Sequence, residues 1–78
     1  MSAAAESLVV YERSGDIWGV AIVGGAKLGE PFPITTGPRW DELPRVYLVG
    51  PSRYLVTYVI GRDPAGVHMA GRFVTVSQ

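Results

Sequence analysis

The chain has 78 residues, no cysteine, one histidine and a formal net charge of zero. These figures exclude a disulfide framework and a thiolate metal site, and they leave few groups for acid–base or metal chemistry. Apolar residues make up 47% of the chain and charged residues only 18%, below the roughly 25% of an ordinary soluble domain. Because a chain of this length buries only about 60% of its unfolded surface, we expect part of this apolar excess to be exposed at an interaction surface.

The ends and the longest uncharged run give no targeting signal. Residues 1–6 lack a basic region followed by an apolar core, so we interpret them as an N-terminal tail of a single domain over residues 1–78. The uncharged run at residues 17–26 has about half the length of a membrane-spanning helix. We therefore expect no membrane association, no secretion by a signal peptide, and a cytoplasmic or virion-associated location.

The first 23 residues predict a β-hairpin. Residues 7–13 alternate as a strand does, residues 17–23 form an apolar run, and a Ser-Gly-Asp turn at residues 14–16 separates them. The second run is apolar on both faces, with Trp18 on one and Ala21 on the other. Small residues on one face favour close approach by another layer or another chain.

Residues 26–44 contain four of the six prolines and show no sustained period, which predicts a Pro/Gly-rich crossover between two β units. Pro38 lies where it would start a short helical turn at residues 39–43, with Trp40 covering an open end of the sheet. Phe32 lies in the extended part of this segment.

The second half predicts a three-stranded meander. Strands are expected at residues 45–50, 54–60 and 67–76, with connections at residues 51–52 and 63–66. The middle strand is the longest run of β-branched and aromatic residues and is apolar on both faces, so it needs cover on both sides. No internal repeat is evident.

These elements predict an all-β fold. We expect a small five-stranded antiparallel barrel, SH3-like or OB-like, with one short helical turn in the crossover. A small β-sandwich is the alternative.

The candidate chemistry is sparse. His68 is expected to be an ordinary strand residue, and the glycines around Lys27 do not match a phosphate-binding loop, which needs Gly-Lys followed by Ser or Thr. We predict no catalytic residue, no metal site and no cofactor. The chain is therefore expected not to be an enzyme.

The leading functional hypothesis is a structural or protein-interaction subunit that self-associates or docks on a larger assembly, for example a virion coat or decoration protein. The expected interface residues are four large apolar side chains and one small residue: Trp18, Ala21, Phe32, Trp40 and Tyr47.

Two alternatives remain. Residues 43–78 carry a net charge of +3 and residues 1–42 a net charge of −3, so the second half could bind a phosphate backbone. The expected contacts in that case are Arg45, Arg53, Tyr54 and Arg72. Inhibition of another protein is the second alternative, because it requires only a complementary surface.

Overall fold

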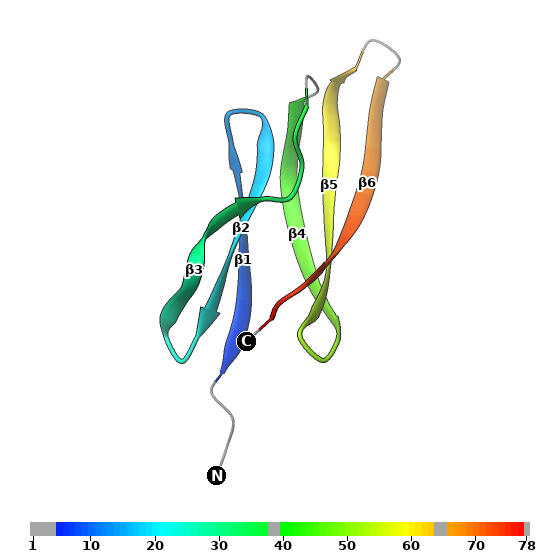
Figure 1. Ribbon diagram of the computed structural model, residues 1–78. Helices are drawn as coiled ribbons and strands as arrows, with labels where there is room; N and C mark the ends of the chain where they lie inside the picture. The colour runs from blue at the N-terminus through cyan, green and yellow to red at the C-terminus, as the bar shows by residue number, and fades with distance from the viewer. Residues whose placement is uncertain (1–4, 38–39, 64–65, 78) are drawn as a thin grey trace.

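The computed structural model, shown in Figure 1, describes residues 5–37, 40–63 and 66–77. Within these ranges the chain forms six strands: β1 (Glu6–Arg13), β2 (Asp16–Val23), β3 (Ala26–Pro33), β4 (Trp40–Gly50), β5 (Arg53–Asp63) and β6 (Gly66–Thr75). They build two antiparallel sheets, in the orders β1-β2-β3 and β4-β5-β6. The all-β prediction is confirmed, but the closed five-stranded barrel is wrong, because each described strand pairs only with its neighbours in the chain. No helix in the described ranges is long and apolar enough to cross a membrane.

The additional strand is β3, in the segment predicted as a crossover. Pro31 and Pro33 indicated an irregular connection, because proline lacks the N–H that a strand donates. β3 is an edge strand, where a missing N–H is tolerated. Gly29 has a φ of +78°, and the register with β2 shifts between Gly19 and Ala21, so a bulge bends β3. Only residues 34–39 separate β3 from β4.

The predicted helical turn is also wrong where it can be judged, since Trp40 to Leu43 belong to β4. Pairing with β5 outweighs the local helix signal, and Pro44 sits at a bulge where the register shifts between Glu42 and Arg45. Leu43 takes a φ of +54° there. Pro38 and Arg39, the other part of this prediction, lie outside the described residues, as do Pro64 and Ala65 of the predicted 63–66 turn.

One hydrophobic core joins the two sheets. Its buried members come from both of them: Leu8, Ile17, Ala21, Ile34, Tyr54, Val56, Tyr58 and Val76. β4 is the strand of the second sheet that lies beside β1 and β2 (Figure 1). The start of β4 is tied to the β1–β2 turn, because the Asp41 amide donates to the Gly15 carbonyl over 2.8 Å. β5 is the central strand of its sheet, as predicted.

The ladders show that the β5–β6 hairpin repeats the β1–β2 hairpin. Val10 pairs with Gly19, and Thr57 pairs with Gly71. Aligning the hairpins on these pairs matches β1 with β5 at a spacing of 47 residues and β2 with β6 at a spacing of 52. Four aligned pairs are identical: Leu8 with Leu55, Val9 with Val56, Tyr11 with Tyr58, and Gly19 with Gly71. No single spacing aligns both strands, because β5 and β6 are longer than β1 and β2 and their register shifts between Ile60 and Asp63.

Because the two hairpins align, equivalent faces of the two sheets are called by the same name here, front or back. Directly paired residues share a face. The front face of the first sheet carries Leu8, Val10, Ile17, Gly19 and Ala21, and that of the second sheet carries Leu55, Thr57, Met69, Gly71 and Phe73. The back face of the first sheet carries Ser7, Val9, Tyr11, Trp18 and Val20, and that of the second carries Tyr54, Val56, Tyr58, Ala70 and Arg72.

Candidate functional site

The front face of the β4-β5-β6 sheet is the main exposed apolar surface of the described chain. Tyr47 pairs with Leu55, and Leu55 pairs with Phe73, so three apolar side chains form a row across three strands. Phe73 is 61% exposed, and Met69, which pairs with Val59 four residues away on the same face, is 73% exposed. Exposed apolar side chains gathered on one face commonly mark an interaction surface.

A hollow of about 410 Å³ lies on this face. Its lining comes from the β4 bulge and from the three strands: Leu43, Pro44, Arg45, Tyr47, Thr57, Val59 and Met69. The bulge between Glu42 and Arg45 displaces β4 locally, and Thr57 leaves space between the larger side chains. The hollow is mostly apolar in its residues, so its shape and chemistry suit side chains of a docked protein.

Arginines accompany the aromatic residues on this surface. The Arg53 guanidinium carbon lies 4.5 Å from the centroid of the Phe73 ring, within the range of a cation–π contact. Arg45 lines the hollow beside Tyr47. Arginine and aromatic side chains are the residues most enriched where proteins bind one another.

The five residues predicted as an interface are separated by the fold. Tyr47 lies on the exposed front face and is 48% exposed. Ala21 is buried in the core, and Phe32 is half-buried and packs against it. Trp18 lies on the back face of the first sheet, with the Arg13 guanidinium carbon 5.2 Å from its ring centroid.

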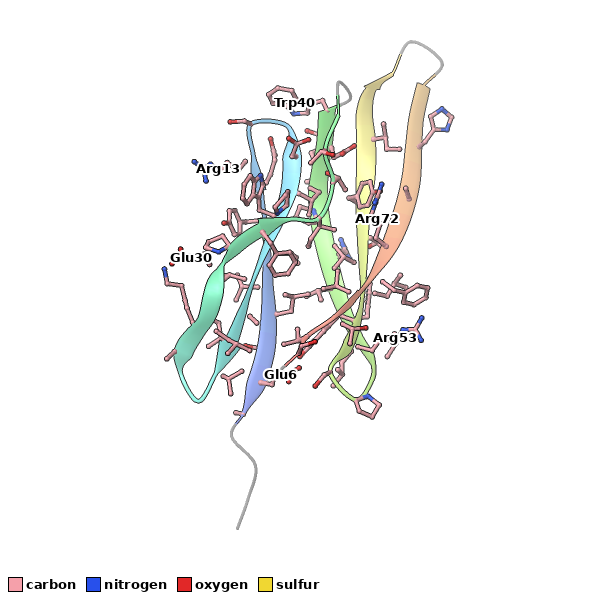
Figure 2. The ribbon with its side chains drawn as sticks, viewed as in Figure 1. Glu6, Arg13, Glu30, Trp40, Arg53 and Arg72 are labelled. Atoms are coloured by element: carbon pink, nitrogen blue, oxygen red, sulfur yellow. The ribbon has the colours of Figure 1, made fainter. Side chains whose placement is uncertain are left out.

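Trp40, the fifth predicted residue, contacts the β1–β2 turn. A methyl group built on Gly15 would lie only 2.8 Å from Cε3 of Trp40. Figure 2 shows Trp40 at the end of the molecule where this turn lies. Trp40 therefore helps to hold the two sheets together at that end, close to the sheet-covering role expected for it.

The residues predicted to contact nucleic acid do not share a surface. Arg45 and Arg53 lie on the front face of the second sheet, whereas Tyr54 and Arg72 lie on its back face. Tyr54 is buried, and the Arg72 Nε donates to the Tyr58 hydroxyl over 3.4 Å. The four side chains do not form a continuous basic face.

Glu6 connects the start of β1 to the β4–β5 turn. The Tyr54 hydroxyl donates to Glu6 Oε1 over 2.7 Å, and the Ser52 hydroxyl donates to Glu6 Oε2 over 2.8 Å. Figure 2 places Glu6 at the opposite end from Trp40. Burial, together with the hydrogen bond to Glu6 and its charge, raises the pKa of Tyr54 to about 12 from its ordinary value of 10.0.

This pKa predicts weaker folding in alkali. The folded protein holds the Tyr54 proton more tightly than the unfolded chain, so the contribution is complete below pH 10 and is lost as the pH rises toward 12. Tyr54→Phe should lower the free energy of unfolding by about 1–2 kcal/mol at neutral pH, because Glu6 loses a donor. The difference between wild type and variant in urea unfolding should shrink between pH 10 and 12. A constant difference across that window would contradict the assignment.

A second hollow, of about 260 Å³, lies between the β3–β4 connection and the second sheet. It is lined by Thr35, Thr36, Gly37, Asp41, Tyr58, Ile60 and Arg72. Several of its groups have structural partners: the Thr35 hydroxyl accepts from the Ile17 amide over 3.0 Å, and Tyr58 accepts from Arg72. In the described parts of the chain, no three His, Asp or Glu side chains gather as a metal would require.

Met69 and Phe73 are the surface residues that sequence reasoning did not select. Alternation along residues 67–76 places them on one face, but periodicity alone does not show whether a neighbouring sheet covers that face. Comparison with known protein families, curated proteins and solved structures gave no match. The function is therefore inferred from the geometry of this chain alone.

Proposed function

We propose that the protein is a non-enzymatic structural or protein-interaction subunit that docks through the front face of its β4-β5-β6 sheet. The observation that supports this proposal is the apolar row of Tyr47, half-buried Leu55 and Phe73, with exposed Met69 further along the same face. A small domain exposes such a row at a cost in solubility unless a partner covers it. Self-association is the simplest form of this function, and a coat or decoration component of a larger particle is one such setting.

A nucleic-acid partner has less support, because two of its four expected contacts lie on the back face of the second sheet. Overall neutrality also weakens the electrostatic attraction that dominates binding to a phosphate backbone. An inhibitor of another protein would use the same apolar surface, and it differs from an assembly subunit in its partner.

The proposal predicts a difference between two equally exposed side chains. Met69→Ser should lower the mass of the assembled protein, because it removes apolar area from the docking surface. Leu48→Ser is the matched control, since Leu48 is 69% exposed on β4 but pairs with Tyr54, away from the front face. Light scattering after size exclusion, at matched concentrations, measures both masses. Equal effects of the two variants, or none, would contradict the proposed surface.

A further inference from the structure

At aligned positions of the two hairpins, a residue that is buried in one hairpin is exposed in the other. On the front faces, Ile17 is fully buried whereas its equivalent, Met69, is 73% exposed. On the back faces, Val56 is fully buried whereas its equivalent, Val9, is 45% exposed. The two sheets therefore use different faces of the same repeated unit to form the core.

The core identifies which faces meet. Leu8, Ile17 and Ala21 come from the front face of the first sheet, and they share one cluster with Tyr54 and Val56 from the back face of the second. The contact inside the chain thus joins a front face to a back face. Units that pack in this way can continue to stack, unless a polar outer face caps the end of the stack.

Outside this contact, the front face of the second sheet is exposed at Met69 and Phe73, and the back face of the first sheet is exposed at Val9 although Val20 is buried there. The front face of the second sheet and the back face of the first sheet are the same two kinds of face that pack together within the chain. We propose that a second copy of the chain stacks head to tail, with the back face of its β1-β2-β3 sheet on the front face of β4-β5-β6. This inference rests on the proposed self-association and specifies its geometry.

The side chains on the back face of the first sheet support a second copy of the chain as the partner. Val9 and Tyr11 are identical to their equivalents Val56 and Tyr58, which are buried against a front face within the chain. A second copy therefore offers the side chains that already fill such a contact.

Head-to-tail contacts have a consequence that face-to-face dimers lack. The contact is heterologous, so an open assembly keeps one free front face at one end and one free back face at the other until a ring closes. Blocking either face alone should then stop growth. Two variants blocked on different faces should still pair with each other, because each retains the face that the other needs.

The test uses one blocking variant for each face. Phe73→Glu places a charge on the front face of the second sheet, and Val9→Glu places one on the back face of the first sheet. Met69→Glu and Ser7→Glu are second variants at exposed positions on the same two faces, to be used if either of the first pair fails to fold. Circular dichroism checks folding, and sedimentation equilibrium measures the mass of each variant and of their equimolar mixture.

The expected result is a mass of 8.4 kDa for each blocked variant alone and twice that mass for the mixture, while the wild type forms larger species. A wild type that associates, with Phe73→Glu monomeric and Val9→Glu unchanged, would overturn head-to-tail stacking and leave the proposed self-association intact. A monomeric wild type at every concentration would overturn both.

Discussion

Replacing Ile17 by alanine is expected to lower the free energy of unfolding by about 2–5 kcal/mol. Ile17 is fully buried where the first sheet packs on the second, and its amide is bound by the Thr35 hydroxyl, so its surroundings have little freedom to close around the lost atoms. A 78-residue domain has a thin margin of stability, so a loss of this size would leave a large unfolded fraction. Urea unfolding followed by tryptophan fluorescence measures it.

The matched control is Met69→Ala, at the equivalent position of the other hairpin. Because Met69 is 73% exposed, this change should alter the free energy of unfolding of the monomer by no more than about 0.5 kcal/mol. Both variants are compared at a protein concentration low enough to suppress association. Equal losses would mean that the two front faces are covered alike, which would contradict the assignment of a buried and an exposed face.

Gly15→Ala is the second large effect, with an expected loss in the free energy of unfolding of about 2–5 kcal/mol. Gly15 has a φ of +83°, which disfavours a side chain by about 1–2 kcal/mol. The added methyl group would also lie 2.8 Å from Cε3 of Trp40, and overpacking of this kind costs about 1–3 kcal/mol. The change therefore tests whether Trp40 holds the β1–β2 turn against the start of β4.

Gly25→Ala separates the two contributions. Gly25 has the same φ of +83° in the β2–β3 turn, but a methyl group there would meet no atom within 4 Å. Its loss should equal the backbone strain alone, about 1–2 kcal/mol. The difference between the variants, from thermal or urea unfolding, then reports the Trp40 contact. Identical losses would show that Trp40 does not pack on the turn.

The sequence predicts the two hairpins well and the segment between them poorly. Residues 7–13, 17–23 and 54–60 alternate or run apolar between clear turn residues, and all three lie in strands. β3 was missed because proline signals a break, although it is compatible with an edge strand. The helical turn near Trp40 was wrong because pairing with β5 outweighs a local preference for a helix.

The docking surface was only partly predictable. Tyr47 was selected and lies on the exposed front face, but Ala21 was selected for a property that core residues share with interface residues. Met69 and Phe73 share a face by alternation, and only the position of the first sheet shows that this face is left uncovered. A core face and an interface face both carry apolar side chains at every second residue of a strand. They can be distinguished only when the positions of both sheets are known.

The most direct test of the account is the absolute mass of the wild-type protein by light scattering, over a range of concentrations and at two salt levels. We predict a mass that exceeds 8.4 kDa and increases with concentration, either without limit or to a fixed multiple if a ring closes. The increase should persist at high salt, because the contact is mainly apolar. A mass of 8.4 kDa at every concentration would contradict self-association through this face.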